Sequence, residues 1–554
     1  MPGGSARFQT RQEVDFVVVG SGTAGGVMAK ELATAGFSVV VLEQGPYLRP
    51  ADFRHDELAV LFQNALMDPR GEDPATFRKT ERDEAKAAAP GTLPVLLYAR
   101  LVGGSSVHFT ANYWRFHEID FIERSRIGRI AGTGFADWPI TYQELEPYYS
   151  KVEWEIGVSG APGPFDPPRS RPFPVPPMPV KSSGVLFERA SRKLGWHPQP
   201  APMAILSQPH NGRAACIHCG FCATFGCEVG AKSSTLAAMI PLAEATGRCE
   251  IRPRSTVFRV ETNAAGRVTH VLYRDSQGQE QSQRAKAVVL CANGAETARL
   301  LLMSESTRSP HGLANASGKV GKYLMLNGYA VATGAFEHPL NEYKSAQVTR
   351  IMWDFYQTDP ARGFYGGGGL DCRWFYFPIL FGLGGLPPDA PRWGSAYKRM
   401  LAEYFTRTMD VGIHTTSLAV ESNSISLDPS VKDQWGRPAA RMTYTDHPDD
   451  LKVVRWFQDK GKELLDAAGA KKIWGPPVQE TTVGVHLLGT ARMGNDPRES
   501  VVDKYHRAHD VRNLFICDGS SFVTSGRGQP TMTIQALAFR AADHIAQFAR
   551  RGEI

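Results

Sequence analysis

The most constraining feature of the sequence is one βαβ pattern near its N-terminus. Residues 14–19 (VDFVVV) are apolar and mostly β-branched, which predicts a buried parallel strand. This strand leads into the turn 20–26 (GSGTAGG), and a helical pattern follows at 27–36. A second apolar run, 37–42 (FSVVVL), predicts another strand that ends in Glu43. The chain therefore begins with strand, glycine turn, helix, strand and acid.

Each part of this unit has a physical role in binding a dinucleotide. Gly20 permits the tight turn, Gly22 lets the backbone approach a pyrophosphate, and Gly25 lets the helix pack against the strand. The first helical residues offer free N–H groups and the positive end of the helix dipole to phosphates, and Glu43 can bind ribose hydroxyls. The predicted contacts are Gly20, Gly22, Thr23, Ala24, Gly25 and Glu43. NAD and FAD share this fingerprint, so the pattern alone does not choose between them.

A second glycine-centred loop lies at 99–108 (ARLVGGSSVH) and continues into the aromatic segment FTANYWRF. Small side chains and free backbone N–H groups suit a flat ring or a phosphate that lies against the backbone. The candidate contacts in this region are Gly103, Gly104, Ser105, Ser106, His108 and Asn112.

The middle of the chain changes character. Residues 251–300 predict strands followed by a helix, which would complete the cofactor domain, with Val257 as a candidate adenine contact. Residues 310–478 are richer in aromatic residues and glycine and predict a separate domain with a sheet that shapes a pocket. Within it, apolar side chains at helical spacing predict a helix that starts near Leu451 and ends at Gly469.

The C-terminal segment carries the other strong signal. It contains HLLGTARMG at 486–494 and a predicted strand at 513–517 that ends in Asp518 and Gly519. A helical pattern follows Thr531. A strand, turn and helix so late in the chain can return to the cofactor sheet and deliver side chains to the bound ring.

Together these motifs resemble the glucose–methanol–choline (GMC) family of FAD-dependent oxidoreductases over nearly the whole chain. The motifs that carry the resemblance are VVVGSGTAGG…VVVLEQGP, RLVGGSSVH, HLLGTARMG…VVD and NLFICDGSSF…PTMTI. The sequence is most similar in appearance to bacterial FAD-dependent sugar and polyol dehydrogenases. The resemblance implies an α/β protein with a Rossmann-like FAD-binding domain and a second, α+β substrate-binding domain on a large, mostly antiparallel sheet.

The resemblance also implies domain boundaries. Residues 1–310 would form the first part of the FAD-binding domain, with lid or crossing segments near 50–98 and 120–200. Residues 311–478 would form the substrate-binding domain. Residues 479–554 would complete the FAD-binding domain and carry the catalytic histidine.

Site residues follow from the same resemblance. The glycine turn and Glu43 would hold the ADP half of FAD, and the loop at 103–106 would lie over the flavin. Val257 would lie on the adenine side, and Asp518, with Gly519 and Thr531 nearby, would face the ribityl or pyrophosphate region. His486 matches the catalytic histidine of the family.

The chemistry supports His486 independently. Hydride leaves a carbinol carbon readily only while the hydroxyl proton is being removed, and a neutral imidazole accepts a proton near neutral pH. Gln529 stands where the family usually has His or Asn. Its amide can donate to a developing alkoxide but cannot take a proton, so Asn112 or His108 are alternative partners.

Four cysteines crowd the segment CIHCGFCATFGC: Cys216, Cys219, Cys222 and Cys227. Four thiols at this spacing can surround a soft metal centre, so an iron–sulfur cluster or zinc is one interpretation. Some of the dehydrogenases that the chain resembles bind a [3Fe–4S] cluster in this region, although with another spacing. Structural thiols or disulfides are the alternative.

Charge and hydropathy limit which kinds of partner and location we expect for this protein. The formal net charge is +6 with no long basic run, which argues against nucleic acid. The sequence has no uninterrupted run of 18 apolar residues, so we expect no transmembrane helix. No export signal is evident, so we expect a cytoplasmic protein unless a partner subunit carries a signal. The segment from Trp374 to Pro388 is apolar and predicts a pocket wall or, alternatively, a docking surface.

Three functions are consistent with these motifs. The first is an FAD dehydrogenase of a sugar, polyol or other alcohol that passes electrons to a quinone, a dye, or a cytochrome or small partner subunit. The second is an alcohol oxidase that makes hydrogen peroxide. The third is a redox-silent lyase on the same fold.

Overall fold

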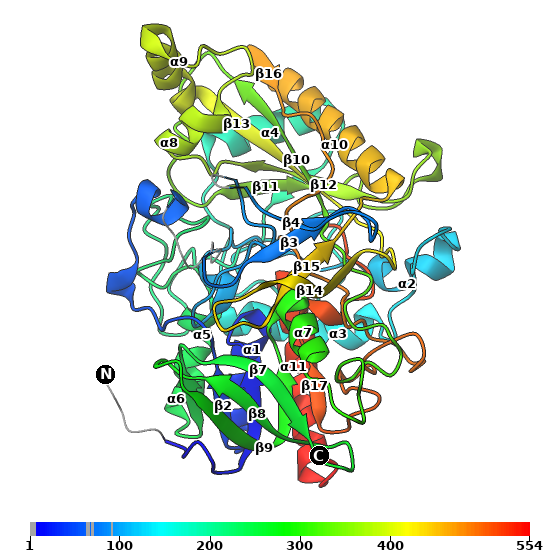
Figure 1. The fold of residues 1–554 in the computed structure, drawn as a ribbon. Coiled ribbons are helices and arrows are strands. Elements are labelled where there is room, and N and C mark those ends of the chain that lie inside the picture. Colours follow the sequence, from blue (N-terminus) through cyan, green and yellow to red (C-terminus); the bar gives the residue numbers. More distant parts are fainter. Residues whose placement is uncertain (1–6, 63–66, 68–70, 90–91) are drawn as a thin grey trace.

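The computed structural model describes residues 7–62, 67, 71–89 and 92–554. Three sheets are stacked along the molecule, with a seven-stranded sheet beside both chain ends, a six-stranded sheet at the opposite end and a four-stranded sheet between them (Figure 1). Within these ranges, no helix is long and apolar enough to cross a membrane.

The seven-stranded sheet contains the predicted βαβ unit. Its path is β6-β2-β1-β9-β8-β7, and β17 also pairs with β9. Strands β6, β2, β1, β9 and β17 are parallel neighbours, whereas β7, β8 and β9 form an antiparallel meander. The strands are β1 (Val14–Val19), β2 (Val39–Leu42), β6 (Cys249–Arg252), β7 (Thr256–Thr262), β8 (Val268–Arg274), β9 (Glu280–Leu290) and β17 (Leu514–Ile516).

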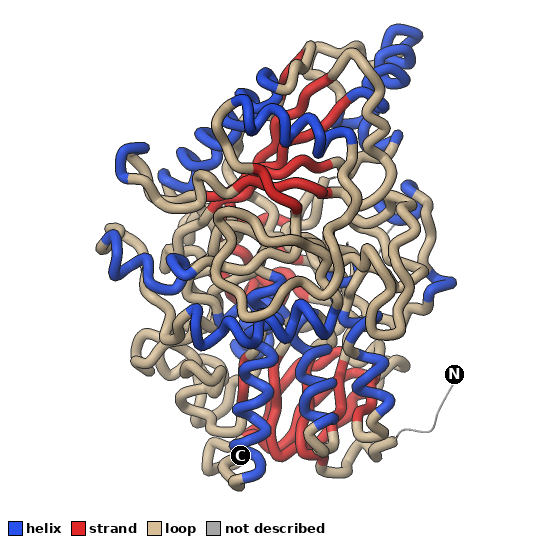
Figure 2. The backbone as a smooth tube through the Cα atoms, turned by 180° about the vertical axis from the view of Figure 1, so that it is seen from behind, coloured by secondary structure: helices blue, strands red, loops and turns tan. Residues whose placement is uncertain are grey.

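Helices cover this sheet, as the view from behind shows (Figure 2). Helix α1 packs against α11, and α11 also packs against α3. The C-terminal strand and helix thus return to the N-terminal sheet, as the sequence predicts. The helices that do not pack on the six-stranded sheet are α1 (Thr23–Thr34), α2 (Glu118–Ile127), α3 (Tyr142–Ile156), α5 (Thr235–Ala238), α6 (Ile240–Ala245), α7 (Asn293–Met303) and α11 (Thr531–Arg550).

The six-stranded sheet is antiparallel throughout, in the order β16-β10-β13-β12-β11-β5. One face is apolar and packs on α10 (Pro448–Ala467) and α4 (Ser182–Lys193). The predicted helix that ends at Gly469 is α10. The strands are β5 (Pro198–Pro200), β10 (Gly328–Ala335), β11 (Val348–Met352), β12 (Gly368–Arg373), β13 (Thr408–Thr415) and β16 (Lys472–Trp474).

The arrangement differs in detail from the predicted boundaries. Helix α4 and β5 join the substrate sheet although they lie outside 311–478. Conversely, β14 (Ser424–Lys432) and β15 (Pro438–Thr443) leave that sheet and pair in a four-stranded one with β3 (Ala75–Arg78) and β4 (Lys86–Ala87). Part of the predicted lid segment 50–98 therefore forms strands, and part of it lies outside the described residues.

The apolar segment that starts at Trp374 is only partly core. Trp374 and Phe381 are buried in a small aromatic cluster, whereas Leu383 is 62% exposed. Helix α8 (Pro378–Leu380) lies within this segment, and α9 (Gly394–Arg407), which has no buried residue, follows it.

Candidate active site

The first glycine turn has the geometry that dinucleotide binding requires. Gly20 has a φ of +89°, and a Cβ on Gly25 would stand 1.9 Å from the carbonyl oxygen of Gly20. Helix α1 begins at Thr23 with no side chain capping its first N–H groups. These donors, with those of Ala24 and its neighbours, stay available to a phosphate.

The second glycine loop lies directly against the first. Gly103 and Gly104 both have positive φ, and a Cβ on Gly104 would stand 2.8 Å from the Cα of Gly22. Ser105 and Ser106 continue the loop as a short 3₁₀ helix, and the Ser106 hydroxyl donates to the carbonyl of Gly103. Two backbone segments that are far apart in sequence therefore form one narrow cradle.

Glu43 organises this cradle from within the protein. Its carboxylate accepts from the backbone N–H and hydroxyl of Ser21 at 3.0 and 2.7 Å, and from the N–H of Gly45 at 2.9 Å. Burial raises the pKa of Glu43, although these hydrogen bonds oppose the rise. The N–H of Ser255 donates to the carbonyl of Glu43, so the start of β7, which contains half-buried Val257, lies near the predicted adenine side.

Several buried polar atoms near the cradle have no partner among the described residues. They are Nδ1 of His108, both amide atoms of Asn112 and the hydroxyl of Ser520. A buried polar atom without a hydrogen bond is costly, so a bound ligand that supplies partners is expected here. Burial and Lys232 lower the pKa of His108 to about 3, which keeps its imidazole neutral. These atoms and the glycine cradle fit the polar, ring-bearing FAD molecule.

The two C-terminal motifs run side by side. The N–H of Gly489 donates to the carbonyl of Gly519 at 3.0 Å, and the N–H of Ala491 donates to that of Ser520 at 2.8 Å. The Asp518 carboxylate accepts from the Thr297 hydroxyl and from the N–H groups of Asn293 and Ser520. Asp518 thus orders the turn, whereas Thr531 opens α11 with no capping side chain.

The proton on His486 is placed by Asn327. The Asn327 amide nitrogen donates to the carbonyls of Thr415, Ser525 and Gly526, so its oxygen faces His486. That oxygen lies 3.2 Å from Nδ1 of His486, and an amide oxygen can only accept. Nδ1 therefore carries the hydrogen, and Nε2 keeps a free lone pair.

A second imidazole lies beside Gln529, which is the partner that the sequence left uncertain. The Gln529 amide nitrogen is 3.0 Å from Nδ1 of His414, and Nε2 of His414 is 2.7 Å from the Asp371 carboxylate. Neither His414 nor Asp371 was predicted. They lie on β13 and β12 in a region with no motif, so only the strand register brings them to the site.

Aromatic side chains line the space around these groups. Trp114 stands edge-on to the rings of His414 and Trp353, with centroids 5.2 and 5.0 Å apart. Tyr329 is 49% exposed, yet burial raises the pKa of its phenol, as expected for a side chain that lines a recess rather than the outer surface.

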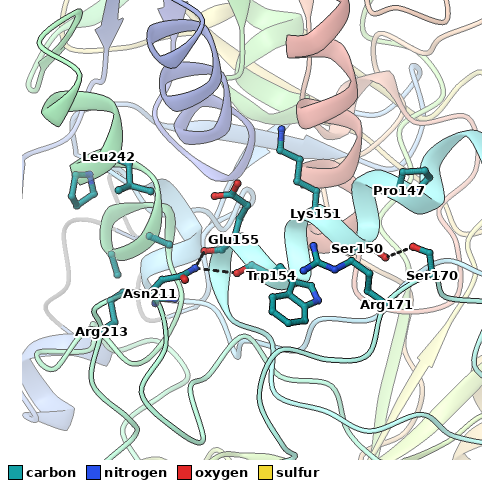
Figure 3. Close-up of a pocket in the computed structure, with 13 residues that line it drawn as sticks. Pro147, Ser150, Lys151, Trp154, Glu155, Ser170, Arg171, Asn211, Arg213 and Leu242 are labelled. Carbon is teal, nitrogen blue, oxygen red and sulfur yellow. Dashed lines mark hydrogen bonds between the residues drawn. The ribbon is translucent and has the colours of Figure 1, made fainter.

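A separate cavity of about 780 Å³ lies elsewhere, along α3 and α6 (Figure 3). Its walls include Lys151, Trp154, Glu155 and Arg213. None of the predicted site residues lines it.

The four clustered cysteines are free thiols. Cys222 is buried, and Cys216, Cys219 and Cys227 are half-buried. Across the described ranges, no three His, Cys, Asp or Glu side chains are placed to hold a metal ion. The four thiols, as arranged in the part of the chain that the structure describes, do not form a ligand set for an iron–sulfur cluster or zinc.

Comparison with known families agrees with this geometry. The N-terminal model of the GMC oxidoreductases matches residues 14–327, and the C-terminal model matches residues 419–538. The chain belongs to the GMC oxidoreductase family. It is an FAD-dependent oxidoreductase that acts on CH–OH donors, with the α/β fold that the sequence motifs predict.

Individual relatives cover almost the whole chain. A 2-methyl-1,2-propanediol dehydrogenase of Mycolicibacterium austroafricanum is 35% identical, over 97% of this chain and 95% of the relative. The fructose dehydrogenase large subunit of Gluconobacter japonicus is 30% identical, over 97% and 98%. The crystal structure of pyridoxine 4-oxidase from Mesorbium loti has a TM-score of 0.64 at 18% identity, covers 96% of this chain and 98% of that one, and shows the shared fold.

Proposed function

We propose that this protein is a dehydrogenase that oxidises the CH–OH group of a sugar, polyol or other alcohol to a carbonyl, with His486 as the base. The observation that carries the proposal is the hydrogen bond from Nδ1 of His486 to Asn327, which leaves Nε2 unprotonated. Burial lowers the pKa of His486 to about 4, so the imidazole is neutral at neutral pH.

The proton and the electron pair leave the substrate separately. Nε2 of His486 takes the hydroxyl proton, and the carbinol C–H bond breaks with its electron pair as the C=O bond forms. FAD, when bound, supplies the hydride acceptor at N5 of its flavin ring. Trp114 is buried beside His414, so one side of this space is lined by an apolar ring.

The relatives support this substrate class and this kind of acceptor. Two of them are named dehydrogenases of a diol and of a sugar, which favours a small polyhydroxylated substrate and an acceptor other than oxygen. A quinone or a cytochrome partner would serve as that acceptor.

The base is tested by His486→Ala, with exposed His338→Ala as the matched control. The change should lower kcat/KM with a dye acceptor by roughly 10²- to 10⁴-fold, because one positioned base contributes about that much. FAD content, measured by flavin absorbance, should equal that of the control. Full activity in His486→Ala would exclude it as the base.

The acceptor is tested by reducing the holoenzyme with each of a panel of sugars, diols and alcohols under nitrogen. The flavin bands should bleach with at least one compound, recover at once with a dye and recover slowly in air. Rapid recovery in air with stoichiometric hydrogen peroxide would identify an oxidase instead, and no bleaching by any hydroxyl compound would favour the lyase.

A further inference from the structure

We propose that the lobe formed by residues 378–407 is a docking face for the surface of a lipid bilayer that contains anionic lipids. The lobe comprises α8, the turn Phe381–Gly385 and α9, and α9 projects beyond the six-stranded sheet (Figure 1). A docking surface is one of the two interpretations that the sequence gives for the apolar segment starting at Trp374. The inference concerns where the protein binds, so it does not rest on the proposed base.

The lobe exposes large apolar side chains to solvent. Trp393 is 86% exposed, Leu383 is 62% exposed and Ile379 is 38% exposed. Leu383 lies in the glycine-rich turn FGLGG, and a Cβ on Gly384 would meet nothing within 4 Å, so the described chain leaves open space beside this turn. Exposed apolar side chains that gather in one part of a surface mark a site of protein or membrane binding.

The inner side of the lobe anchors these side chains. Gly382 lies against α9, where a Cβ would stand 2.6 Å from the hydroxyl of Tyr397, and the apolar side of α9 packs on the small aromatic cluster. The Glu57 carboxylate accepts from the N–H groups of Ile379 and Leu380 at 3.0 and 2.6 Å. Packing and hydrogen bonds from within the protein therefore set the direction in which the exposed side chains point.

Basic side chains border the exposed apolar ones. The exposed cations of the lobe that have no carboxylate partner among the described residues are Arg392, Lys398 and Arg399. The lobe has two acidic residues, Glu403 and Asp389, and Asp389 is paired with Lys472 at 2.7 Å. The cations are thus left to bind anionic groups outside the protein.

This combination fits a lipid surface better than a protein partner. A stable protein interface covers a continuous patch of about 800 Å² on each partner. Here Leu383 and Trp393 lie in separate segments, and Arg392 directly precedes Trp393. Tryptophan favours the boundary between headgroups and acyl chains, and Lys and Arg attract anionic headgroups. The apolar side chains would therefore insert while the cations stay among the headgroups.

Vesicle flotation tests the docking face on the holoenzyme. The protein should float with vesicles made of equal parts phosphatidylcholine and phosphatidylglycerol, and much less with vesicles of phosphatidylcholine alone. High salt should release it, because salt screens the attraction between the cations and the headgroups. Absence of binding to the anionic vesicles, or binding that high salt leaves unchanged, would overturn the proposal.

Two double variants separate the apolar and the electrostatic contributions. Leu383→Ser/Trp393→Ser should lower the partition coefficient on anionic vesicles by at least roughly 10-fold, because the inserted apolar surface is lost. Lys398→Glu/Arg399→Glu should lower it by at least roughly 25-fold, at about fivefold for each cation near the surface, and should change binding to phosphatidylcholine alone very little. Both variants should keep the FAD content of the wild type, since they change only exposed side chains of the lobe.

The end of α2 supplies matched controls on another side of the molecule (Figure 1). Ile127 is 40% exposed there, and Arg126 and Arg129 are exposed cations beside it. Ile127→Ser and Arg126→Glu/Arg129→Glu should leave vesicle binding unchanged. If these controls lose as much binding as the lobe variants, the overall charge and apolar surface control binding, and the proposal fails.

A protein partner, including a second copy of this chain, is the competing occupant. Sedimentation without vesicles should give one oligomeric state for the wild type and for Leu383→Ser/Trp393→Ser. An oligomer that this variant dissociates, together with a wild type that binds no vesicles, would assign the lobe to self-association and overturn the proposal. If the double variant loses FAD, Trp393→Ser alone takes its place and should give a smaller loss of vesicle binding, and unchanged binding would again overturn the proposal.

Discussion

At the scale of single residues, the side-chain amide of Asn327 determines which nitrogen of the His486 ring carries the hydrogen. Asn327 has a φ of +56°, a conformation that asparagine tolerates better than most side chains, and this places its amide among three carbonyls. The amide oxygen of Asn327 then points toward Nδ1 of His486. A carboxylate in this position would favour a protonated imidazole, whereas the neutral amide sets the tautomer without adding charge.

The half-buried, desolvated imidazole of His486 predicts an acid-shifted pH profile. Because burial lowers its pKa to about 4, the base should stay unprotonated through neutral and mildly acidic pH. We expect kcat/KM to be lost only as the pH falls through about 4, with flavin absorbance as a check that the holoenzyme is intact. A limb near the ordinary histidine pKa of about 6.5 would show that His486 is not the titrating base.

The sequence identified the residues whose role is local and missed those placed by long-range pairing. Gly20 and Gly25 are recognisable because a turn and a helix start need glycine within a few positions. His486 is recognisable from its motif. His414 reaches the site through strand pairing, and Asn327 reaches it from the loop residue just before β10. They lie 72 and 159 positions away from His486, and neither has a local pattern that indicates its partner.

At the scale of elements, two glycine loops form the cradle by backbone contact. Gly104→Ala would place a methyl group 2.8 Å from the Cα of Gly22, whereas Gly278→Ala, also at positive φ, would meet nothing within 4 Å. Both changes carry the backbone cost of about 1 kcal/mol or more. We expect only Gly104→Ala to purify with substoichiometric FAD, measured by absorbance after denaturation. Equal FAD loss in both variants would show that strain, and not the close approach, is responsible.

The elements themselves were largely predictable. The apolar runs at 14–19 and 513–517 became β1 and β17 within a residue or two, because buried parallel strands have no competing pattern. The segment 75–87 lies within the predicted lid segment and forms two strands, β3, which pairs with β15, and β4, which pairs with β3. Because β3 pairs with a strand more than 350 positions away, the sequence around residues 75–87 does not indicate this pairing.

At the scale of the whole molecule, the cofactor site joins both ends of the chain. The cradle comes from residues before 110, and the turn at 518–521 comes from the last 40 or so residues, next to β9 and α7. The side chains on the substrate side, such as His414, lie on the six-stranded sheet instead. A ligand that contacts all of these segments links the stability of the two halves.

This linkage predicts how removal of FAD changes stability. A ligand that binds only the native state adds about 4 kcal/mol at a free concentration 1,000 times its Kd, so the FAD-stripped protein should unfold at a clearly lower Tm. Added FAD should restore the Tm and NAD should not, because the fingerprint that both dinucleotides share is only one part of the site. Thermal unfolding followed by intrinsic fluorescence measures the change. An unchanged Tm after FAD removal would mean that the two chain ends hold together without the cofactor, and that the unpartnered atoms of Asn112 and His108 do not destabilise the empty site.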